Sequence, residues 1–371
     1  MKSPKPLTLL LFVLAALFTI SSNTLIEKYQ SSSRQLLENP LFSIGLQGWQ
    51  TKESPGRAIV LKDGTVILKS LDKEGQIEIY QEVKGQGQNT RYRLEAELQT
   101  TDVASGEKSW NKARLLLIPI IDGKASYKLK HAAASLVGSQ DWKTYSEVFQ
   151  IPKGVQTIRV VAQMSRCSGE FSLRNPTLYR VVETPLYTFS KWLVISLWAT
   201  FFFSLFQPCL RTKGNFFFKI LLVLTVVAIV IGTAIPGQLK NDLRDDLLRE
   251  SGIFTIPVQQ TVKEIMVAED LRPFDVPKVD ITKLAHFFLF ALFALLLLFT
   301  NPEMSVKQLL LNLFLVACST ELIQLYVEGR SSLIRDVAID MAGGGIILLC
   351  WQLTTIRKRV CFYYCDNFSR R

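Results

Sequence analysis

The chain has 371 residues, of which 48% are hydrophobic, and it carries a formal net charge of +11 at pH 7. This length leaves room for more than one domain, and a basic balance is typical of partners such as nucleic acid or anionic lipid. The basic residues lie beside long apolar runs, and no basic stripe interleaved with aromatic residues is present. The composition therefore argues for a membrane protein and against nucleic acid as a partner.

The first predicted element is the apolar segment 7–20, which follows Lys2 and Lys5. A segment of this kind is either a cleaved signal peptide or a retained anchor. The residues after it, SSNTLIEKY, lack a clear small-x-small cleavage pattern. We therefore expect residues 1–22 to form a signal anchor and the first membrane span, with cleavage as the open alternative.

After residue 35 the pattern changes to short apolar runs between turn signals such as Asp63-Gly64 and Asp122-Gly123. Several short strands at this spacing predict an antiparallel β-sandwich over residues 35–184. Only one of the six cysteines, Cys167, lies in this region, so no disulfide framework is predicted. The runs predicted as strands are Val66–Leu68, Ile77–Tyr80, Tyr92–Leu98, Leu115–Ile121, Tyr145–Phe149, Ile158–Ala162 and Phe171–Tyr179.

Three stretches of this region resemble carbohydrate-binding modules of the jelly-roll, galactose-binding-like type. Residues 39–49 (NPLFSIGLQGW) look like the N-terminal signature of these modules. Residues 142–152 (WKTYSEVFQIP) resemble a later strand, and residues 169–179 (GEFSLRNPTLY) resemble the last strand. The resemblance implies a jelly-roll fold, with a glycan as the class of ligand.

Tryptophans are the residues of the sandwich most relevant to glycan binding. We expect Trp49 and Trp142 to be structural, because aromatic residues dominate sandwich cores. Trp110, in a polar loop beside Lys108 and Asn111, is the candidate glycan platform. The alternative is an exposed or partly packed loop tryptophan. No pair of carboxylates in this region has a spacing that supports glycosidase chemistry, so no catalysis is assigned to it.

Five further apolar segments follow, and most are long enough to cross a hydrocarbon core of about 30 Å. They predict a membrane domain over residues 186–355, followed by a basic cytoplasmic tail over residues 356–371. Within this domain, residues 236–282 form an outer segment with amphipathic leucine spacing, either an interfacial helix or a lid. The predicted spans are 187–206, 216–235, 284–299, 309–326 and 334–353.

The basic residues that flank the six spans give a consistent orientation. With these residues in the cytoplasm, both termini are cytoplasmic, and the sandwich and residues 236–282 are extracytoplasmic. The predicted fold class is a membrane α-helical bundle with an inserted all-β extracytoplasmic domain, in a multi-pass protein of the plasma membrane. The flanking residues are Lys2, Lys5, Arg211, Lys213, Lys307, Arg357, Lys358 and Arg359.

Polar residues gather at the predicted outer ends of the last three spans. A charge near a bilayer centre costs roughly 2.5–3.5 kcal/mol, so such a group needs a compensating arrangement. Glu321 and Gln324 have i, i+3 spacing, and Asp336 and Asp340 have i, i+4 spacing, which places each pair on one helical face. The group, called the polar cluster below, comprises Lys283, His286, Glu321, Gln324, Arg330, Asp336 and Asp340.

The order and spacing of these residues resemble the VanZ-like membrane protein family over residues 216–353. The family has an Asp/Lys-x-x-His-Phe entry to one helix, which residues 280–287 (DITKLAHF) match with two additional residues. It then has Glu-x-x-Gln, found here as ELIQ, followed by an Arg and an Asp. The chain departs at Asp340, where the family usually has Asn. The resemblance implies a membrane protein of a family linked by name, in some members, to lipoglycopeptide resistance.

The residue types of the polar cluster support proton transfer and anion binding. His286 can move a proton near neutral pH, and the carboxylates can pair with Arg330 in bidentate geometry. Lys283 and Arg330 together can hold a phosphate or another anionic headgroup. No ligand spacing favours a metal, and no cofactor is predicted. The catalytic candidates are His286, Glu321 and Asp336, and the substrate-binding candidates are Lys283, Gln324, Arg330 and Asp340.

These observations predict a cell-envelope membrane protein that recognises a glycan or a lipid-linked envelope component through the sandwich and the polar cluster. The alternative is a non-enzymatic, membrane-anchored binding or scaffold protein in which the cluster is a structural network. Whether the protein is an enzyme stays open. A transporter is disfavoured, because the charges lie towards one side of the membrane and not at its midplane. The expected partners are membrane lipids and a glycan or lipid-linked envelope precursor.

Overall fold

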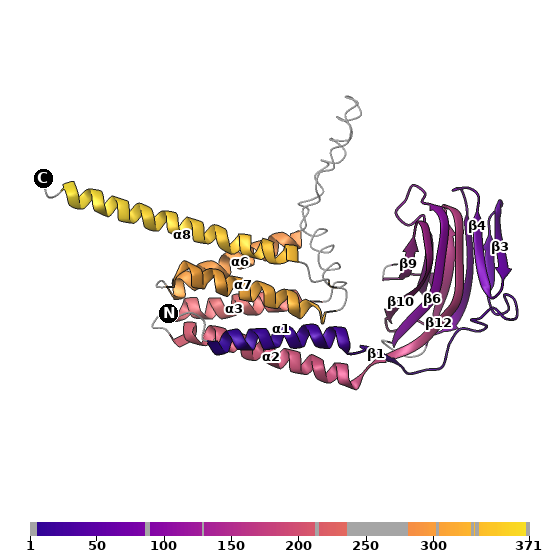
Figure 1. The fold of residues 1–371 in the computed structure, drawn as a ribbon, viewed down its shortest axis with the longest axis horizontal. Helices are drawn as coiled ribbons and strands as arrows, with labels where there is room; N and C mark the ends of the chain where they lie inside the picture. Colours follow the sequence, from indigo (N-terminus) through magenta and orange to yellow (C-terminus); the bar gives the residue numbers. More distant parts are fainter. Residues whose placement is uncertain are drawn as a thin grey trace, which may run out of the picture. The chain divides into compact units, whose positions relative to one another are not determined.

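The computed structural model describes residues 6–85, 90–127, 130–211, 215–235, 281–301, 304–327, 330 and 334–368, with side chains up to residue 354 except those of residues 281 and 282. The chain forms two compact units (Figure 1). One is Glu27–Thr184, and the other joins Met1–Ile26 to Pro185–Arg371. The predicted outer segment 236–282 lies almost wholly outside the described residues, and the side chains of the predicted tail also lie outside them.

Glu27–Thr184 is a sandwich of two antiparallel sheets, as the turn spacing predicts. Sheet A has the strand order β10-β6-β12-β4-β3, with β1 beside β12. Sheet B has the order β2-β5-β11-β7-β8, with β9 beside β7. The strands are β1 (Tyr29–Ser31), β2 (Gln50–Glu53), β3 (Arg57–Lys62), β4 (Thr65–Ser70), β5 (Gln76–Lys84), β6 (Thr90–Ala104), β7 (Ala113–Ile121), β8 (Lys124–Ala125), β9 (Ala132–Leu136), β10 (Gly138–Ile151), β11 (Thr157–Ser165) and β12 (Ser168–Glu183).

Alternating side chains of these strands build the core between the sheets. Along β6, Tyr92, Leu94, Ala96 and Leu98 are buried, whereas the residues that alternate with them are only half-buried. Successive side chains of a strand point to opposite faces, and full burial of one leucine contributes roughly 1.5–3 kcal/mol. The Asp63-Gly64 turn between β3 and β4 has positive φ at both residues, the conformation of a type I′ hairpin.

The two tryptophans expected in the core differ. Trp49 is buried, with its ring centroid 5.4 Å from that of Phe42, so the prediction is right for this residue. Trp142 is half-buried on the strand at one edge of sheet A, and the Arg174 guanidinium lies 4.3 Å from its ring centroid. The prediction of a core role is wrong for Trp142, because this side chain lies outside the buried cluster between the sheets.

Strand β1 is an element that the sequence did not predict. Its three residues, YQS, show no apolar alternation, yet they pair with Val181, Val182 and Glu183 at the end of β12. The sandwich therefore begins at Glu27, before the predicted boundary at residue 35, and its first and last strands are neighbours.

The second unit is helical, and the described residues contain six helices long and apolar enough to cross a membrane. This finding confirms the six apolar segments of the prediction. Helix α7 begins with a capping box between Ser305 and Gln308. The helices are α1 (Pro6–Leu25), α2 (Pro185–Arg211), α3 (Phe216–Ala234), α6 (Ile281–Thr300), α7 (Val306–Gln324) and α8 (Ile334–Phe368).

Helix α1 packs along α2 and also contacts α7 (Figure 1). The buried Trp198 of α2 donates its indole N–H to Thr19 Oγ1 of α1 at 3.0 Å. Ser22 Oγ of α1 lies 2.5 Å from Tyr326 Oη, whose ring stacks on Tyr187 of α2. Polar as well as apolar contacts thus tie α1 into the helical unit.

Candidate functional site

Two glycines of α8 set the level at which the polar cluster residues meet. A side chain at Gly343 would collide with the Phe287 carbonyl oxygen of α6, and one at Gly344 would contact Leu313 of α7. Helix α8 therefore lies against both neighbours at these points, because glycine allows close helix approach. Asp340 and Asp336 lie on α8 before these contacts, within the first two turns of the helix.

Helices α6 and α8 face each other through two acid–base pairs. Lys283 Nζ lies 3.9 Å from Asp336 Oδ1, and His286 Nδ1 lies 3.5 Å from Asp340 Oδ1. The i, i+3 spacing on α6 matches the i, i+4 spacing on α8, so the pairs form successive rungs between the helices. Both rungs lie within about 10 Å of the helix starts, given a rise of 1.5 Å per residue.

The two rungs differ in burial. The side chains of Lys283 and Asp336 are 34% and 26% exposed, whereas those of His286 and Asp340 are 20% and 0% exposed. Neither Asp340 oxygen has a hydrogen-bond partner among the described residues, although His286 is close to one of them. A buried carboxylate without a counter-charge is very costly. The inner pair is therefore stable as aspartate with imidazolium, or as carboxylic acid with neutral imidazole.

Glu321 and Gln324 occupy the matching end of α7. Both are buried, and Gln324 Nε2 donates to Glu321 Oε1 at 3.0 Å. Helices α7 and α8 run in opposite directions, and Leu313 lies beside Gly344. Glu321 follows Leu313 by eight positions and Asp336 precedes Gly344 by eight, which places these carboxylates at the same level. All three helices thus contribute ionisable groups at one end of the unit.

Arg330 contacts a helix that the sequence did not link to the cluster. Its Nε donates to the Ile235 carbonyl at 3.1 Å, and its Nη2 donates to the Gly232 carbonyl at 3.1 Å. These carbonyls belong to the last turn of α3 and the residue that follows it, where backbone acceptors lack intrahelical partners. The sequence offered no signal for this contact, because backbone acceptors have no residue signature.

The arrangement can hold a proton and orient a basic imidazole. An aspartate beside His286 Nδ1 favours the tautomer with a proton on that atom, which leaves Nε2 as a proton acceptor. Lys283 provides a partly exposed cation at the outer rung. No group of three or more His, Cys, Asp or Glu residues in the described parts of the chain has a geometry for holding a metal ion.

The candidate glycan platform lies in the other unit. Trp110 is 52% exposed in the loop before β7, and Lys108 Nζ lies 5.2 Å from its ring centroid. A second polar group surrounds Trp142 on sheet A, where Arg174 Nε donates to Glu97 Oε2 at 2.8 Å. Asn175, which donates to Oε1 of the same carboxylate, and Arg174 lower the pKa of Glu97. The sequence missed this group, because Glu97, Trp142 and the adjacent pair Arg174 and Asn175 lie on three strands far apart along the chain.

Comparison with known protein families finds a match to the helical half of this architecture. Residues 189–355 match the family model described as VanZ/LLP1. No curated protein matches the chain. The match overlaps the stretch in which the sequence resembles the VanZ-like family and includes the whole polar cluster.

Solved structures resemble the sandwich at low identity, and this likeness carries no argument about ligands. The enzymatically active domain of bacteriophage CBA120 tailspike protein 4 is 12% identical, with a TM-score of 0.30, over 39% of this chain and 21% of that chain. A CBM4 structure is 10% identical, with a TM-score of 0.30, over 39% and 99% of the chains. TmCBM61 in complex with β-1,4-galactotriose is 18% identical, with a TM-score of 0.28, over 40% and 99%.

The family match covers five of the six candidate spans, and the sandwich separates these five from α1 in the chain. This chain carries a VanZ-like domain over residues 189–355. An antiparallel β-sandwich precedes this domain, between α1 and α2 of the chain.

Proposed function

We propose that this chain is a cell-envelope membrane protein that binds a lipid-linked envelope component at the polar cluster, where His286 and Asp340 handle a proton. The observation that carries the proposal is the wholly buried Asp340, held against His286 of a neighbouring apolar helix. Ionisable groups inside membrane helices are costly and commonly functional. The asparagine usual in the family can hydrogen-bond here without charge, so an aspartate at this position favours a role for its proton.

The outer rung supports recognition of an anionic group. Lys283 is partly exposed, and its separation of 3.9 Å from Asp336 leaves its ammonium donors open to a further acceptor. The guanidinium of Arg330 already donates to two carbonyls at the end of α3. Lys283 is therefore the better candidate for a lipid phosphate, and Arg330 would position α3 beside the site.

The charge pattern beside the spans supports recognition at the outer leaflet. Basic residues at the other ends of the spans favour an extracytoplasmic location for both. In this orientation the sandwich, with exposed Trp110, would recognise the glycan part of an envelope component. An exposed aromatic ring next to polar groups is the kind of surface on which sugar rings stack.

Lipid retention tests the proposal. The full chain is purified with native lipids, and bound lipids are identified by native mass spectrometry for the wild type and for His286→Gln, Asp340→Asn and Lys283→Gln. Loss of a hydrogen bond to a charged group costs about 1.5–3 kcal/mol, so each variant is expected to retain about tenfold less of a specific lipid. Lys307→Gln, at the opposite end of α7, is the control. Equal retention in all five proteins would contradict the proposal.

A scaffold role is the second candidate, and two contacts favour it. Gln324 donates to Glu321 within one helix, and Arg330, between α7 and α8 in the chain, donates to a carbonyl just after the end of α3, as in a network that fixes helices. In that case Asp340→Asn would lower the midpoint of thermal unfolding without any specific lipid being lost. A lipid lost at an unchanged midpoint would support the binding site.

A further inference from the structure

Short links join one end of the sandwich to two candidate membrane spans. Thr184 alone separates the end of β12 at Glu183 from the start of α2 at Pro185. Two Cα steps of about 3.8 Å therefore bring Glu183 to the first residue of a candidate span. Three residues separate Leu25, the last residue of α1, from Tyr29 of β1. The first and last strands of the sandwich therefore lie within about 10–15 Å of the ends of two candidate spans, given the same step length.

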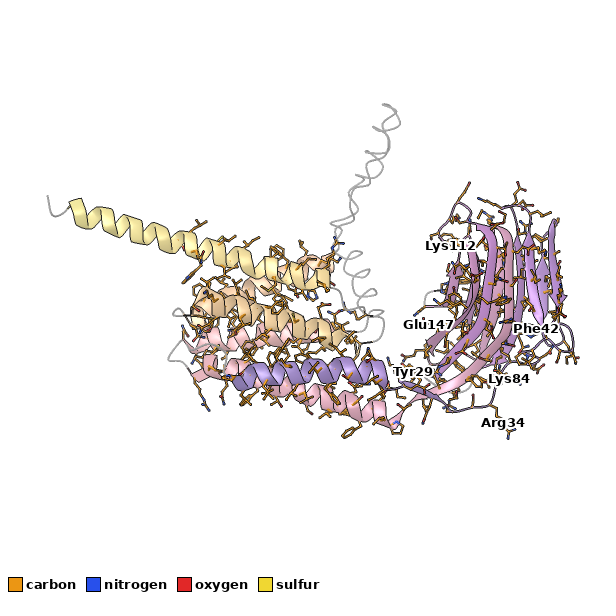
Figure 2. The ribbon with its side chains drawn as sticks, viewed as in Figure 1. Tyr29, Arg34, Phe42, Lys84, Lys112 and Glu147 are labelled. Atoms are coloured by element: carbon orange, nitrogen blue, oxygen red, sulfur yellow. The ribbon has the colours of Figure 1, made fainter. Side chains whose placement is uncertain are left out.

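The strand register identifies the other residues at this end. Arg91 of β6 pairs with Val181 of β12, and Ile151 at the end of β10 pairs with Thr90 of β6. Only five residues join the end of β5 at Lys84, in sheet B, to the start of β6 at Thr90, so β5 finishes at the same end of the sandwich. Figure 2 labels Tyr29, Arg34 and Lys84 at this end and Lys112 at the opposite end of the strands. The cations gathered here are Lys28, Arg34, Lys84, Arg91, Arg93, Lys153 and Arg180.

Most acids at this end already have a cationic partner. Arg93 lies 3.5 Å from Glu27, and Arg91 lies 3.9 Å from Glu183. Glu82 pairs with Arg159 of the neighbouring strand at 2.5 Å, and Lys124 follows Asp122 by two positions in the sequence. The charges of these groups largely cancel.

Four cations at this end remain exposed, and no ion pair joins any of them to another described residue. They are Arg34, Lys84, Lys153 and Arg180, called the basic end below. The opposite end of the sandwich is different, because cations such as Lys73 and Lys108 alternate there with Glu74 and Glu107. The uncompensated positive charge is thus on the end that the chain holds at the membrane.

We infer that the basic end docks on anionic phospholipid headgroups of the adjoining leaflet. Clustered lysine and arginine residues beside a span attract an anionic bilayer, and the attraction falls off within a Debye length of about 10 Å at 0.1 M salt. The links at Thr184 and at residues 26–28 tether the same end of the sandwich to α1 and α2. Docking would hold this end of the sandwich against the lipid headgroups without a dedicated protein interface.

Photo-crosslinking to lipid tests this inference with the full chain in nanodiscs. Gln156, an exposed residue in the turn between β10 and β11, is replaced by p-benzoylphenylalanine, and lipid adducts are measured by mass spectrometry. Discs contain either phosphatidylcholine alone or phosphatidylcholine mixed with phosphatidylglycerol. We expect a higher adduct yield in the mixed discs and a fall to the phosphatidylcholine level in 1 M salt, where the Debye length is about 3 Å.

Two charge variants make the test specific. Arg34→Gln, Lys84→Gln, Lys153→Gln and Arg180→Gln together should lower the adduct yield in mixed discs about tenfold or more. The control replaces Lys73, Lys108, Lys112 and Arg166 at the opposite end by glutamine and should leave the yield unchanged. Resistance of the buried Cys167 thiol to alkylation by iodoacetamide verifies that each variant is folded. Equal yields in both disc types, no adducts in either, or an equal loss in both variants would overturn the inference.

Discussion

Asp340 and His286 show how much depends on single residues in an apolar setting. Their side chains are almost enclosed by helices, where replacing one partner leaves the other without compensation. Glu321, a catalytic candidate from the sequence, accepts a hydrogen bond from Gln324 on its own helix. The residue types of a site can be read from a sequence, but the pairing among them depends on helix rotation, which the sequence does not specify.

Cys167 of the sandwich gives a prediction at the same scale. Burial raises its thiol pKa from the ordinary 9.0 to about 11, with Arg114 lowering it only partly. We expect iodoacetamide at pH 8.5 to leave Cys167 unmodified in the folded protein and to alkylate it after denaturation, as measured by peptide mass spectrometry. Rapid alkylation of the folded protein would show that this core opens readily.

The same shift makes stability depend on pH in a defined direction. The folded pKa is raised, so the protonated thiol contributes stability fully below about pH 9, and this contribution is lost as the pH rises through about 11. The full difference corresponds to roughly 1.4 kcal/mol per pKa unit. Cys167→Ala should therefore show less loss of stability between pH 8 and pH 11 than the wild type.

At the scale of elements, close packing of α8 decides whether the rungs meet. A Cβ at Gly343 would collide with the backbone of α6, whereas Gly345 has nothing within 4 Å of the same position. Gly343→Ala should cost roughly 1–3 kcal/mol through overpacking, and Gly345→Ala should gain up to about 1 kcal/mol of helix propensity. Thermal unfolding in detergent measures both, and equal midpoints for the two variants would contradict this packing.

Helix α1 behaves in the structure as part of the bundle. Thr19→Val would leave the buried Trp198 N–H without its acceptor, at a cost of about 1–3 kcal/mol. Thr24→Val, on the exposed face of the same helix, is the control. We expect Thr19→Val, and not Thr24→Val, to lower the midpoint of thermal unfolding. We also expect the intact mass of the membrane-extracted protein to include residues 1–22. A mature chain without these residues would refute the retained anchor.

Elements with strong periodicity were predictable, and those set by tertiary partners were not. The alternation along residues 92–98 and the long apolar segments decide strand or helix locally. By contrast, β1 has three residues without alternation and exists because the end of β12 offers it backbone partners. Trp142 was expected in the core, but its position on an edge strand places it beside Arg174. The local sequence does not indicate which strand will pair with another, or whether a side chain on an edge strand will point into the core.

At the scale of the whole molecule, the orientation in the membrane is the main proposal from charge. The positive-inside pattern places the sandwich outside and both termini inside. Protease is added to cells in which any layer outside the plasma membrane is permeabilised and the plasma membrane stays sealed. It should cleave within or beside the sandwich and leave a C-terminal tag intact. Cleavage of the tag under these conditions, with a cytoplasmic marker protein preserved, would reverse the orientation and place the polar cluster at the inner leaflet.

The central claim is that the polar cluster binds a lipid-linked ligand through Asp340 and His286, and ligand-induced stabilisation tests it most directly. The lipid that co-purifies with the protein is removed and titrated back while the unfolding temperature is followed for the wild type, Asp340→Asn and Gly345→Ala. Selective binding to the folded state at 100 times Kd stabilises by about 2.7 kcal/mol, so the wild type and Gly345→Ala should rise by several degrees. Asp340→Asn should fold and show little or no rise. An equal rise in all three proteins would contradict the claim.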